Sequence, residues 1–117
     1  MTEGMCRSSG VNYEVQCQDR LCQHTYNGQS SKNGYSRGLE HVDDFKNKRE
    51  RSIMWKHCRE KHNGMSRRFK MSIRKIVRND PTKRLITEAI YINKTNPNSS
   101  MNDKTEWNYI DLPQLKK

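Results

Sequence analysis

The feature that most constrains the fold of this chain is a pair of cysteines followed, much later, by a pair of histidines. Four residues separate Cys17 from Cys22, and four separate His57 from His62. Thiolate and imidazole ligands suit zinc, and both spacings lie within the range that zinc sites tolerate. We expect the cysteines on a turn between two strands and the histidines at a helix end whose last turn loosens. Together they would form a closed, structural set of four ligands.

A bound ion would be useful because the chain can bury only a thin core. It has 117 residues, of which 31% are hydrophobic and 31% are charged. A small, polar domain gains folding free energy from a bound metal. Two alternatives stay open: Cys58 could replace His57 as a ligand, or the four residues could be unrelated, the thiols buried as small apolar groups and the imidazoles at the surface. Cys6 lies too near the N-terminus to be included.

The charge balance indicates a polyanionic partner. The chain has 23 Lys and Arg against 13 Asp and Glu, a net charge of +10. Nucleic acid is the commonest such partner and an acidic membrane surface is the other, although a basic surface can also be merely solvated. No apolar run is long enough to span a membrane, and the first ten residues lack the apolar stretch of a signal peptide. We therefore expect an intracellular protein, in which four cysteines favour metal over disulfides.

Hydrophobic periodicity and capping residues predict a small α/β (α+β) domain with the order β-β-α-α-β-α. Ser52 is a plausible helix N-cap, and Asp80-Pro81 is a favourable helix start. The predicted elements are strands over 11–16 and 25–28, helices over 35–47 and 53–61, a strand over 71–77 and a helix from Asp80-Pro81 to Asn93. Residues 29–34 are predicted to be a loop, residues 1–10 a disordered N-terminus and residues 109–117 a tail. The three strands would form one antiparallel sheet.

A second set of residues has the chemistry needed to cut a phosphodiester. Tyr13 and Tyr26 lie on the first two strands, where both hydroxyls can reach one side of the sheet. Arg37 and His41 are four residues apart and share one helix face. Glu88 lies among apolar neighbours in the last helix, where its carboxylate could bind Mg²⁺. A metal-binding carboxylate, an arginine for the phosphate and groups that move protons are the parts that hydrolysis requires.

Each of these residues also has an ordinary structural interpretation. The tyrosines could be aromatic sheet residues, and Arg37 could pair with Glu40 or lie against His41 on a solvated face. Glu88 could be the intrahelical partner of Arg84. Taken one at a time, the residues favour these ordinary roles.

The ordered set resembles the GIY-YIG nuclease family. Gly10-Val11-Asn12-Tyr13 stands where the family has GIY, and Tyr26-Asn27-Gly28 stands where it has YIG. Further matching segments are Tyr35-Ser36-Arg37-Gly38-Leu39-Glu40-His41, Leu85-Ile86-Thr87-Glu88-Ala89, and 96–102 running into Glu106-Trp107-Asn108. The resemblance covers about residues 11–108 and is closest to the domains of Penelope-like and related metazoan retroelements. Those domains place two cysteines between the motifs and two histidines later.

The resemblance implies a role for each matching residue. Tyr13 would be the general base or orient the water, Tyr26 would assist at the phosphate, and Arg37 would hold the phosphate. His41 would support proton transfer and Glu88 would bind Mg²⁺ or Mn²⁺. The closing polar residue would be Asn102, with Asn98 and Asn108 as rivals. Zn²⁺ would be bound by Cys17, Cys22, His57 and His62.

The resemblance also implies a metal-dependent endonuclease that hydrolyses DNA, leaves a 3′-hydroxyl and acts in the nucleus. A reverse transcriptase module in a longer parent protein would be its partner. The sequence departs from the family at Asn12 and Asn27, where the motifs otherwise have apolar residues, and Asn27 puts a polar side chain into the sheet. The alternatives are a catalytically inactive, zinc-stabilised module that binds nucleic acid and a structural or interaction protein.

Overall fold

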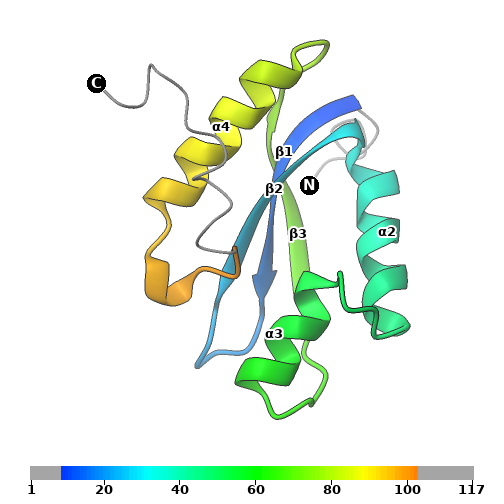
Figure 1. The fold of residues 1–117 in the computed structure, drawn as a ribbon, viewed down its shortest axis with the longest axis vertical. Coiled ribbons are helices and arrows are strands. Elements are labelled where there is room, and N and C mark those ends of the chain that lie inside the picture. Colours follow the sequence, from blue (N-terminus) through cyan, green and yellow to red (C-terminus); the bar gives the residue numbers. More distant parts are fainter. Residues whose placement is uncertain (1–8, 103–117) are drawn as a thin grey trace.

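A three-stranded antiparallel sheet with the strand order β2-β1-β3 forms the centre of the computed structural model (Figure 1). The structure describes residues 9–102. Its elements are β1 (Ser9–Cys17), β2 (Thr25–Asn33), α2 (Gly34–Lys46), α3 (Ile53–Lys61), β3 (Phe69–Ile76), α4 (Pro81–Lys94) and the 3₁₀ turn η1 (Pro97–Ser99). This architecture confirms the predicted α+β class, the three-stranded antiparallel sheet and the order of its elements.

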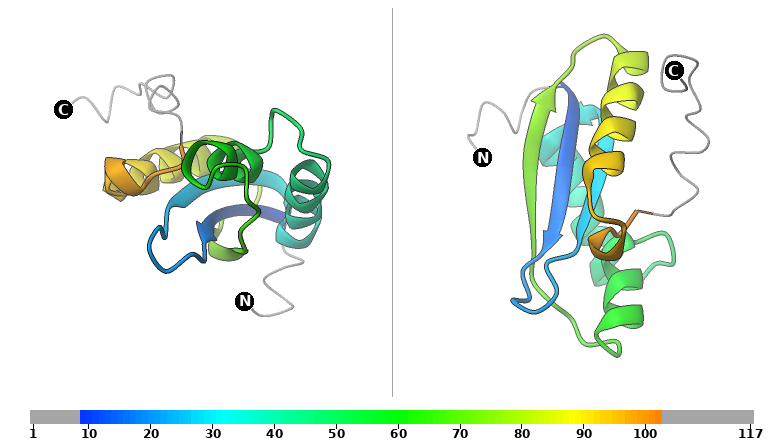
Figure 2. Two further views of the ribbon diagram at one scale, coloured as in Figure 1. Left: turned by 90° about the horizontal axis from the view of Figure 1, so that it is seen from below. Right: turned by 90° about the vertical axis from the view of Figure 1, so that its left-hand side faces the viewer.

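Helices cover both faces of the sheet. α4 packs on one face, against β2 and β1, and α2 lies on the other face, as two perpendicular views show (Figures 1 and 2). Alternate residues of β1, Val11, Tyr13 and Val15, form the main core with Ile73 of β3 and Met54 of α3. β1 supplies most of this core because it is the central strand and is paired along both edges.

The main difference from the predicted elements is at β2. Residues 29–33, which the sequence predicted to be a loop, continue the strand to Asn33. Their composition is polar and turn-like, but pairing with β1 satisfies their backbone groups, as in the register Val11↔Ser30. Long-range pairing therefore outweighs local propensity here. The prediction of a loop over 29–34 is wrong, because strand residues lead directly into α2.

The N-terminal end of the described chain belongs to the sheet. β1 begins at Ser9, so Ser9 and Gly10, placed in a disordered N-terminus by the sequence, are strand residues. Residues 1–8 lie outside the described part of the chain, as do Asn108 and the tail over 109–117. Among the helices that are described, none has the length and apolar run needed to cross a bilayer.

The helix starts follow from their capping residues. The side chain of Ser52 accepts a hydrogen bond from the Trp55 amide, and that of Asp80 accepts one from the Lys83 amide, with Pro81 as the first residue of α4. Both caps confirm the sequence prediction. α2 is capped by Asn33, which ends β2 and accepts from the Ser36 amide. A capping residue therefore fixes the sharp change from strand to helix at this point.

Candidate metal centre and tyrosine site

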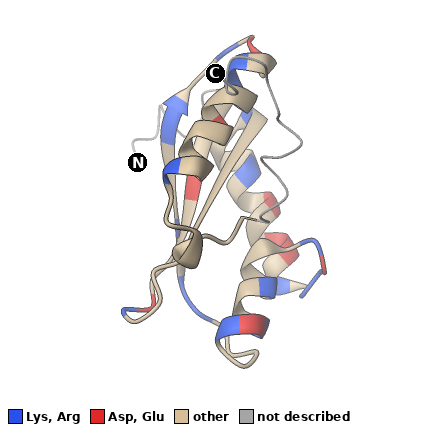
Figure 3. Ribbon diagram, turned by 60° about the vertical axis from the view of Figure 1, so that its left-hand side comes forward, with Lys and Arg blue, Asp and Glu red and all other residues tan. Residues whose placement is uncertain are grey.

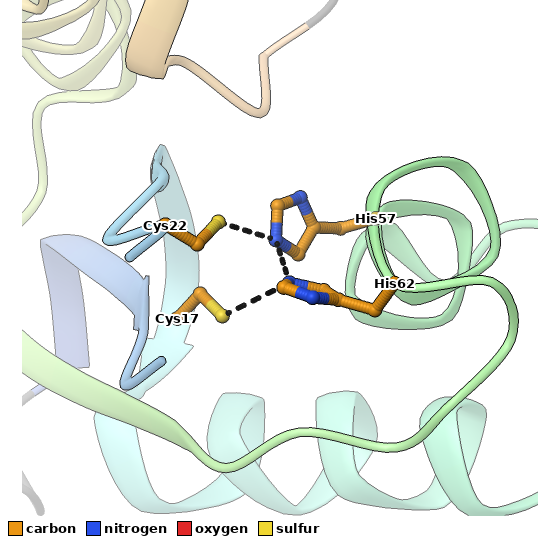
Figure 4. Close-up of side chains that lie close together, drawn as sticks. All are labelled: Cys17, Cys22, His57 and His62. Atoms are coloured by element: carbon orange, nitrogen blue, oxygen red, sulfur yellow. Dashed lines mark hydrogen bonds between the residues drawn. The ribbon is translucent and has the colours of Figure 1, made fainter. Parts of the chain in front are cut away.

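Two cysteines and two histidines converge at one end of the sheet (Figure 4). Cys17 ends β1 and Cys22 lies in the connection to β2, whereas His57 lies in α3 and His62 directly follows that helix. The Sγ atom of Cys17 is 3.6 Å from Nε2 of His62, and Sγ of Cys22 is 3.2 Å from Nε2 of His57. All four ligand atoms lie within 4.8 Å of one another. The set could hold a metal ion such as zinc.

The backbone brings the two cysteines together through a tight turn. The amides of Cys22 and Gln23 both donate to the carbonyl of Asp19, at 3.1 Å. Gln23 takes a positive φ of 52°, and the Cys17 amide bonds to the carbonyl of His24 at 2.9 Å. These bonds fold the connection back on itself, so that both sulfurs point the same way.

The histidines converge because α3 ends between them. His62 leaves helical geometry with φ −128° and ψ 21°. Asn63 and Gly64 then adopt positive φ values of 54° and 80°, and the Gly64 amide donates to the Cys58 carbonyl at 3.0 Å. This αL ending is a common helix terminator. It lets His62 turn towards His57, with 3.2 Å between their Nε2 atoms.

The ionisation of this set suits a cation. Burial, followed by the charges of His24 and His62, lowers the pKa of His57 to about 4, so its imidazole is neutral at pH 7. Burial raises the pKa of the Cys17 thiol to about 11. A bound cation would displace that proton, because metals bind the thiolate. The donor set therefore fits zinc, whose structural sites use four ligands of this kind.

Two residues beside the set were not singled out from the sequence. Nδ1 of His24 lies 2.9 Å from the Cys22 sulfur. Asp19 lies 3.9 Å from Nδ1 of His62 and accepts a hydrogen bond from Arg67 at 3.0 Å. Their positions within and next to the Cys17–Cys22 turn were the only sequence signal. Cys58, the alternative ligand, is buried but is not one of the four converging residues.

A second polar cluster is built around the Tyr13 hydroxyl. The Arg37 Nε donates to this oxygen at 3.0 Å, and Nε2 of His41 lies 2.8 Å from it. Arg37 and His41 share the face of α2 that looks towards β1, as their spacing predicted. The ring of Tyr26 completes the group, with its centroid 6.3 Å from that of Tyr13 and 6.2 Å from that of His41.

Gly28 makes room for the Tyr13 ring. It is paired with Tyr13 across β1 and β2. A Cβ atom at this position would lie 2.6 Å from the Tyr13 ring and hydroxyl and 2.8 Å from the Tyr26 ring. These approaches are too close for any side chain. The glycine therefore lets the ring of Tyr13 lie across β2 and bring its hydroxyl to Arg37 and His41.

The electrostatics fix the direction of the hydrogen bonds. Burial raises the pKa of Tyr13 above its usual value of 10, against the opposing effect of Arg37. Burial and then the positive charge of Arg37 lower the pKa of His41 to about 4. At neutral pH the hydroxyl is therefore protonated and the imidazole neutral. Since Arg37 can only donate, the Tyr13 hydroxyl accepts from Arg37 and donates to Nε2 of His41.

This cluster opens into a polar hollow of about 430 Å³. Its lining residues are Tyr26, Arg37, Glu40, His41, Asp43, Asp44, Arg51 and Ile53. The carboxylates on its rim are paired with cations: Glu40 with Arg37 at 3.4 Å, and Asp44 with Arg51 at 2.9 Å. A phosphate entering the hollow would therefore meet carboxylates whose charge is largely compensated. Arg51 lies in a polar loop and carries no pattern in the sequence that would mark it as a site residue.

The last two predicted residues lie elsewhere around β2. Glu88 is half-buried in α4, on the other face of the sheet, and its negative charge is near enough to contribute to the raised pKa of Tyr13. Asn102 lies at the outer edge of β2. Its Oδ1 accepts from the Asn27 amide at 2.8 Å and its Nδ2 donates to the Asn27 carbonyl at 2.9 Å. The Asn102 side chain thus pairs with β2 as a neighbouring strand would.

The two asparagines that depart from the GIY and YIG patterns have partners on the α4 side. Asn12 donates from Nδ2 to the carbonyl of Arg84 at 3.0 Å, and Asn27 donates from Nδ2 to Thr95 at 2.9 Å. Arg74 also donates to Oδ1 of Asn27, at 3.3 Å. Both asparagines are fully buried, and these bonds tie β1 and β2 to α4. Both polar atoms of the Asn27 side chain have partners, whereas Oδ1 of Asn12 is buried without a hydrogen-bond partner among the described residues.

Comparison of this chain with protein-family models, with curated proteins and with solved structures gave no match.

Proposed function

We propose that this chain is a metal-dependent endonuclease domain of the GIY-YIG type, which hydrolyses DNA phosphodiester bonds. The observation that carries the proposal is the hydrogen-bonded chain Arg37–Tyr13–His41 beside a polar hollow. A buried tyrosine hydroxyl held between a fixed cation and a neutral imidazole is suited to proton transfer, because one neighbour stabilises the phenolate and the other accepts the proton. The order of the motif residues along the sequence adds the family resemblance to this geometry.

The residues suggest the following sequence of events. Tyr13 passes its proton to Nε2 of His41 as its oxygen takes a proton from the attacking water. The hydroxide attacks phosphorus, the bond to the 3′ oxygen breaks, and that oxygen is protonated by solvent. The products are a 5′-phosphate and a 3′-hydroxyl. Arg37 and Tyr26 both line the hollow, where Arg37 would offer its guanidinium to the phosphate oxygens and Tyr26 would assist.

Glu88 is the residue that would hold a divalent cation. Mg²⁺ is usually bound by one or two carboxylates and several waters, which a half-buried glutamate in α4 can accommodate. When bound, Mg²⁺ or Mn²⁺ would stabilise the charge that develops on the phosphate. The negative charge of Glu88 contributes to the raised pKa of Tyr13. The carboxylate therefore lies within electrostatic range of the Tyr13 hydroxyl, which supports this assignment.

The remaining parts of the proposal concern the structural ion and the partners. Zn²⁺ would occupy the set formed by Cys17, Cys22, His57 and His62. The net charge of +10 supports DNA as the substrate, and the retroelement resemblance suggests a reverse transcriptase module in a longer parent protein that works in the nucleus. A polymerase could extend the 3′-hydroxyl that the cut leaves.

A plasmid-nicking assay tests the proposal. Zinc-loaded protein is incubated with supercoiled DNA with and without added Mg²⁺ or Mn²⁺, beside the variants Glu88→Ala and Tyr13→Phe. Omission of the cation is a better control than EDTA, which would also remove zinc. We expect cation-dependent nicking that falls at least about 100-fold in both variants, because each removes a group acting on the reacting atoms. DNA affinity should change less than about threefold.

Two results would change the proposal. Equal nicking by Glu88→Ala would contradict the role given to that carboxylate. A folded, zinc-loaded wild-type protein that binds DNA without nicking it would instead establish the alternative, a catalytically inactive module that binds nucleic acid.

A further inference from the structure

The segment from Lys61 to Asn79 has the strongest local charge imbalance in the described part of the chain. It contains seven Lys and Arg residues and no Asp or Glu. By contrast, residues 40–51 contain four acidic and four basic residues, so that segment is balanced. Figure 3 shows basic residues along β3 and in the connection before it. The excess positive charge is therefore concentrated on one strand and its approach.

β3 is an edge strand, with β1 as its only partner in the described sheet. Its outer edge therefore presents backbone amides as well as side chains. Lys70 pairs with Gln16 and Ser72 with Glu14, which places Lys70 and Ser72 on the α4 side of the sheet. α4 makes its main sheet contacts with β2 and β1. The basic side chains of β3 consequently lie beside this helix and remain exposed.

An irregularity in the strand adds one residue, Arg74, to β3. The register with β1 shifts between Asn12 and Tyr13, which pair with Lys75 and Ile73, so that Arg74 is the extra residue of a bulge. Arg74 is held in place by Glu14 at 3.1 Å and by the ring of Tyr91, 4.1 Å away. Bulges commonly redirect side chains at sheet edges.

Four of the basic residues are exposed and form no ion pair with a described carboxylate: Lys61, Arg68, Lys70 and Lys75. The last three lie on β3 or directly before it. Within β3, five residue steps of about 3.4 Å separate Lys70 from Lys75, a distance of about 17 Å. That length corresponds to about five base pairs of B-DNA. A charged edge can serve merely to prevent sheet-to-sheet association, for which one or two lysines suffice. Because no Asp or Glu interrupts the segment from Lys61 to Asn79, its charge is also complementary to that of a polyanion.

We infer that the outer edge of β3, with the connection before it, is a docking surface for the phosphate backbone of duplex DNA, separate from the residues that would cut. The choice of DNA among polyanions rests on the proposed function. The docking surface itself rests on the charge distribution and the open strand edge. Phosphate contacts of this kind position a duplex without reading its sequence. Tyr13 pairs with Ile73 and faces the α2 side, whereas Lys70 and Lys75 pair with Gln16 and Asn12 on the α4 side, so these lysines lie on the opposite face of the sheet from the Tyr13 cluster.

The test compares two triple variants that remove equal charge. One carries Arg68→Gln, Lys70→Gln and Lys75→Gln; the control carries Lys46→Gln, Lys56→Gln and Arg59→Gln on α2 and α3, where these side chains are also exposed. Binding of a fluorescent 20-base-pair duplex by zinc-loaded protein is measured by anisotropy at several salt concentrations, without Mg²⁺. We expect the β3 variant to bind about 10- to 100-fold more weakly at low salt, with the slope of log K against log salt reduced by about 2 to 3.

The control variant should lose less than about threefold. Equal losses in the two variants, or no loss in the β3 variant, would overturn the docking surface. Lysine acetylation of the wild-type protein, read by mass spectrometry with and without the duplex, gives a second measurement that depends on no variant. Protection of Lys70 and Lys75 above that of Lys46 and Lys56 is expected, and the reverse order would also overturn it.

The nicking assay separates this inference from the proposed function. Weak binding by the β3 variant beside a wild-type protein that never nicks would keep the docking surface and remove the nuclease. Cation-dependent nicking with an unaffected β3 variant would do the opposite.

Discussion

Gly28 shows how a single residue can decide where a buried hydroxyl group lies. No positive φ requires a glycine at this position; the close approach of the Tyr13 ring does. The tyrosine is fully buried, yet its hydroxyl still meets Arg37 and His41. A residue without a side chain on β2 is therefore a structural condition for the polar cluster on the α2 side.

We predict that Gly28→Ala will displace the Tyr13 ring. The added methyl group should cost about 1–3 kcal/mol of unfolding free energy, as overpacking in a core does. Nicking should fall at least about tenfold, since the hydroxyl moves away from its partners. Denaturant unfolding and the nicking assay measure the two effects.

Gly38→Ala is the matched control. Gly38 lies within helix α2, and a Cβ added there would meet only the Met71 sulfur, at 3.4 Å. It should change stability by less than about 1 kcal/mol. A Gly28→Ala protein as stable and as active as this control would contradict the packing argument.

His41 makes the stability depend on pH. Its pKa is about 4 in the folded protein and 6.5 for an ordinary histidine, so the unfolded state binds more protons between these values. Stability present above pH 6.5 is therefore lost as the pH falls towards 4. We expect a loss of about 2 kcal/mol between pH 7 and pH 5 from this residue.

Denaturant unfolding at both pH values, in wild type and in His41→Gln, measures this contribution. Any loss of metal at low pH affects both proteins, so the difference between them isolates His41. An identical pH dependence in the two proteins would show that His41 is not held neutral by its surroundings.

At the level of elements, the sequence predicted what local patterns determine. The caps Ser52 and Asp80 and the Pro81 start fixed two helix beginnings within a residue. The spacing of Arg37 and His41 placed them on one helix face. Features that depend on long-range contacts could not be predicted from the sequence. The extension of β2 over 29–33 requires pairing with β1, and no local pattern contains that register.

The candidate site follows the same division. The Cys and His spacings indicated a four-ligand set, because each pair is local to one turn. The approach of Asp19 to His62 and the use of Arg51 in the hollow depend on how α3 and its flanking loops pack, which the sequence does not reveal. The apolar residues Leu39, Val42 and Phe45 fall at helical spacing in α2, but only Phe45 packs on the core, whereas Leu39 and Val42 are exposed.

The edge of β2 gives a prediction about one element held by another. The Asn102 side chain satisfies both the amide and the carbonyl of Asn27, which is fully buried. Asn102→Ala would leave these two backbone groups without those bonds, at a cost of about 2 kcal/mol or more. Thermal or denaturant unfolding measures it.

Asn98→Ala is the matched control, because Asn98 lies exposed in η1. It should cost less than about 0.5 kcal/mol. Equal stability of the two variants would mean that water replaces the Asn102 amide without loss, and that the segment after η1 does not secure β2.

For the whole molecule, the question is what holds together a domain with so small a core. The main cluster of buried apolar side chains contains five residues, with six more packed partly against it. The Cys and His set ties the end of β1 and the β1–β2 connection to α3, parts that are far apart in the sequence. A metal bound there would couple the sheet to that helix, so removing it should loosen the whole domain and not one loop.

We therefore predict that Cys17→Ser will lower both the zinc content and the melting temperature, whereas Cys58→Ser will keep about one zinc per chain. Cys58 is buried like Cys17 but lies outside the converging set, so the comparison separates ligand loss from loss of a buried thiol. Zinc is measured by elemental analysis and folding by circular dichroism, before and after treatment with a chelator.

The wild type should unfold, wholly or in large part, when zinc is removed and refold when it is returned, because the thin core alone cannot offset the conformational entropy of the chain. A metal-free protein with an unchanged melting temperature would show that the apolar core is sufficient, and that the four ligands converge without contributing to stability.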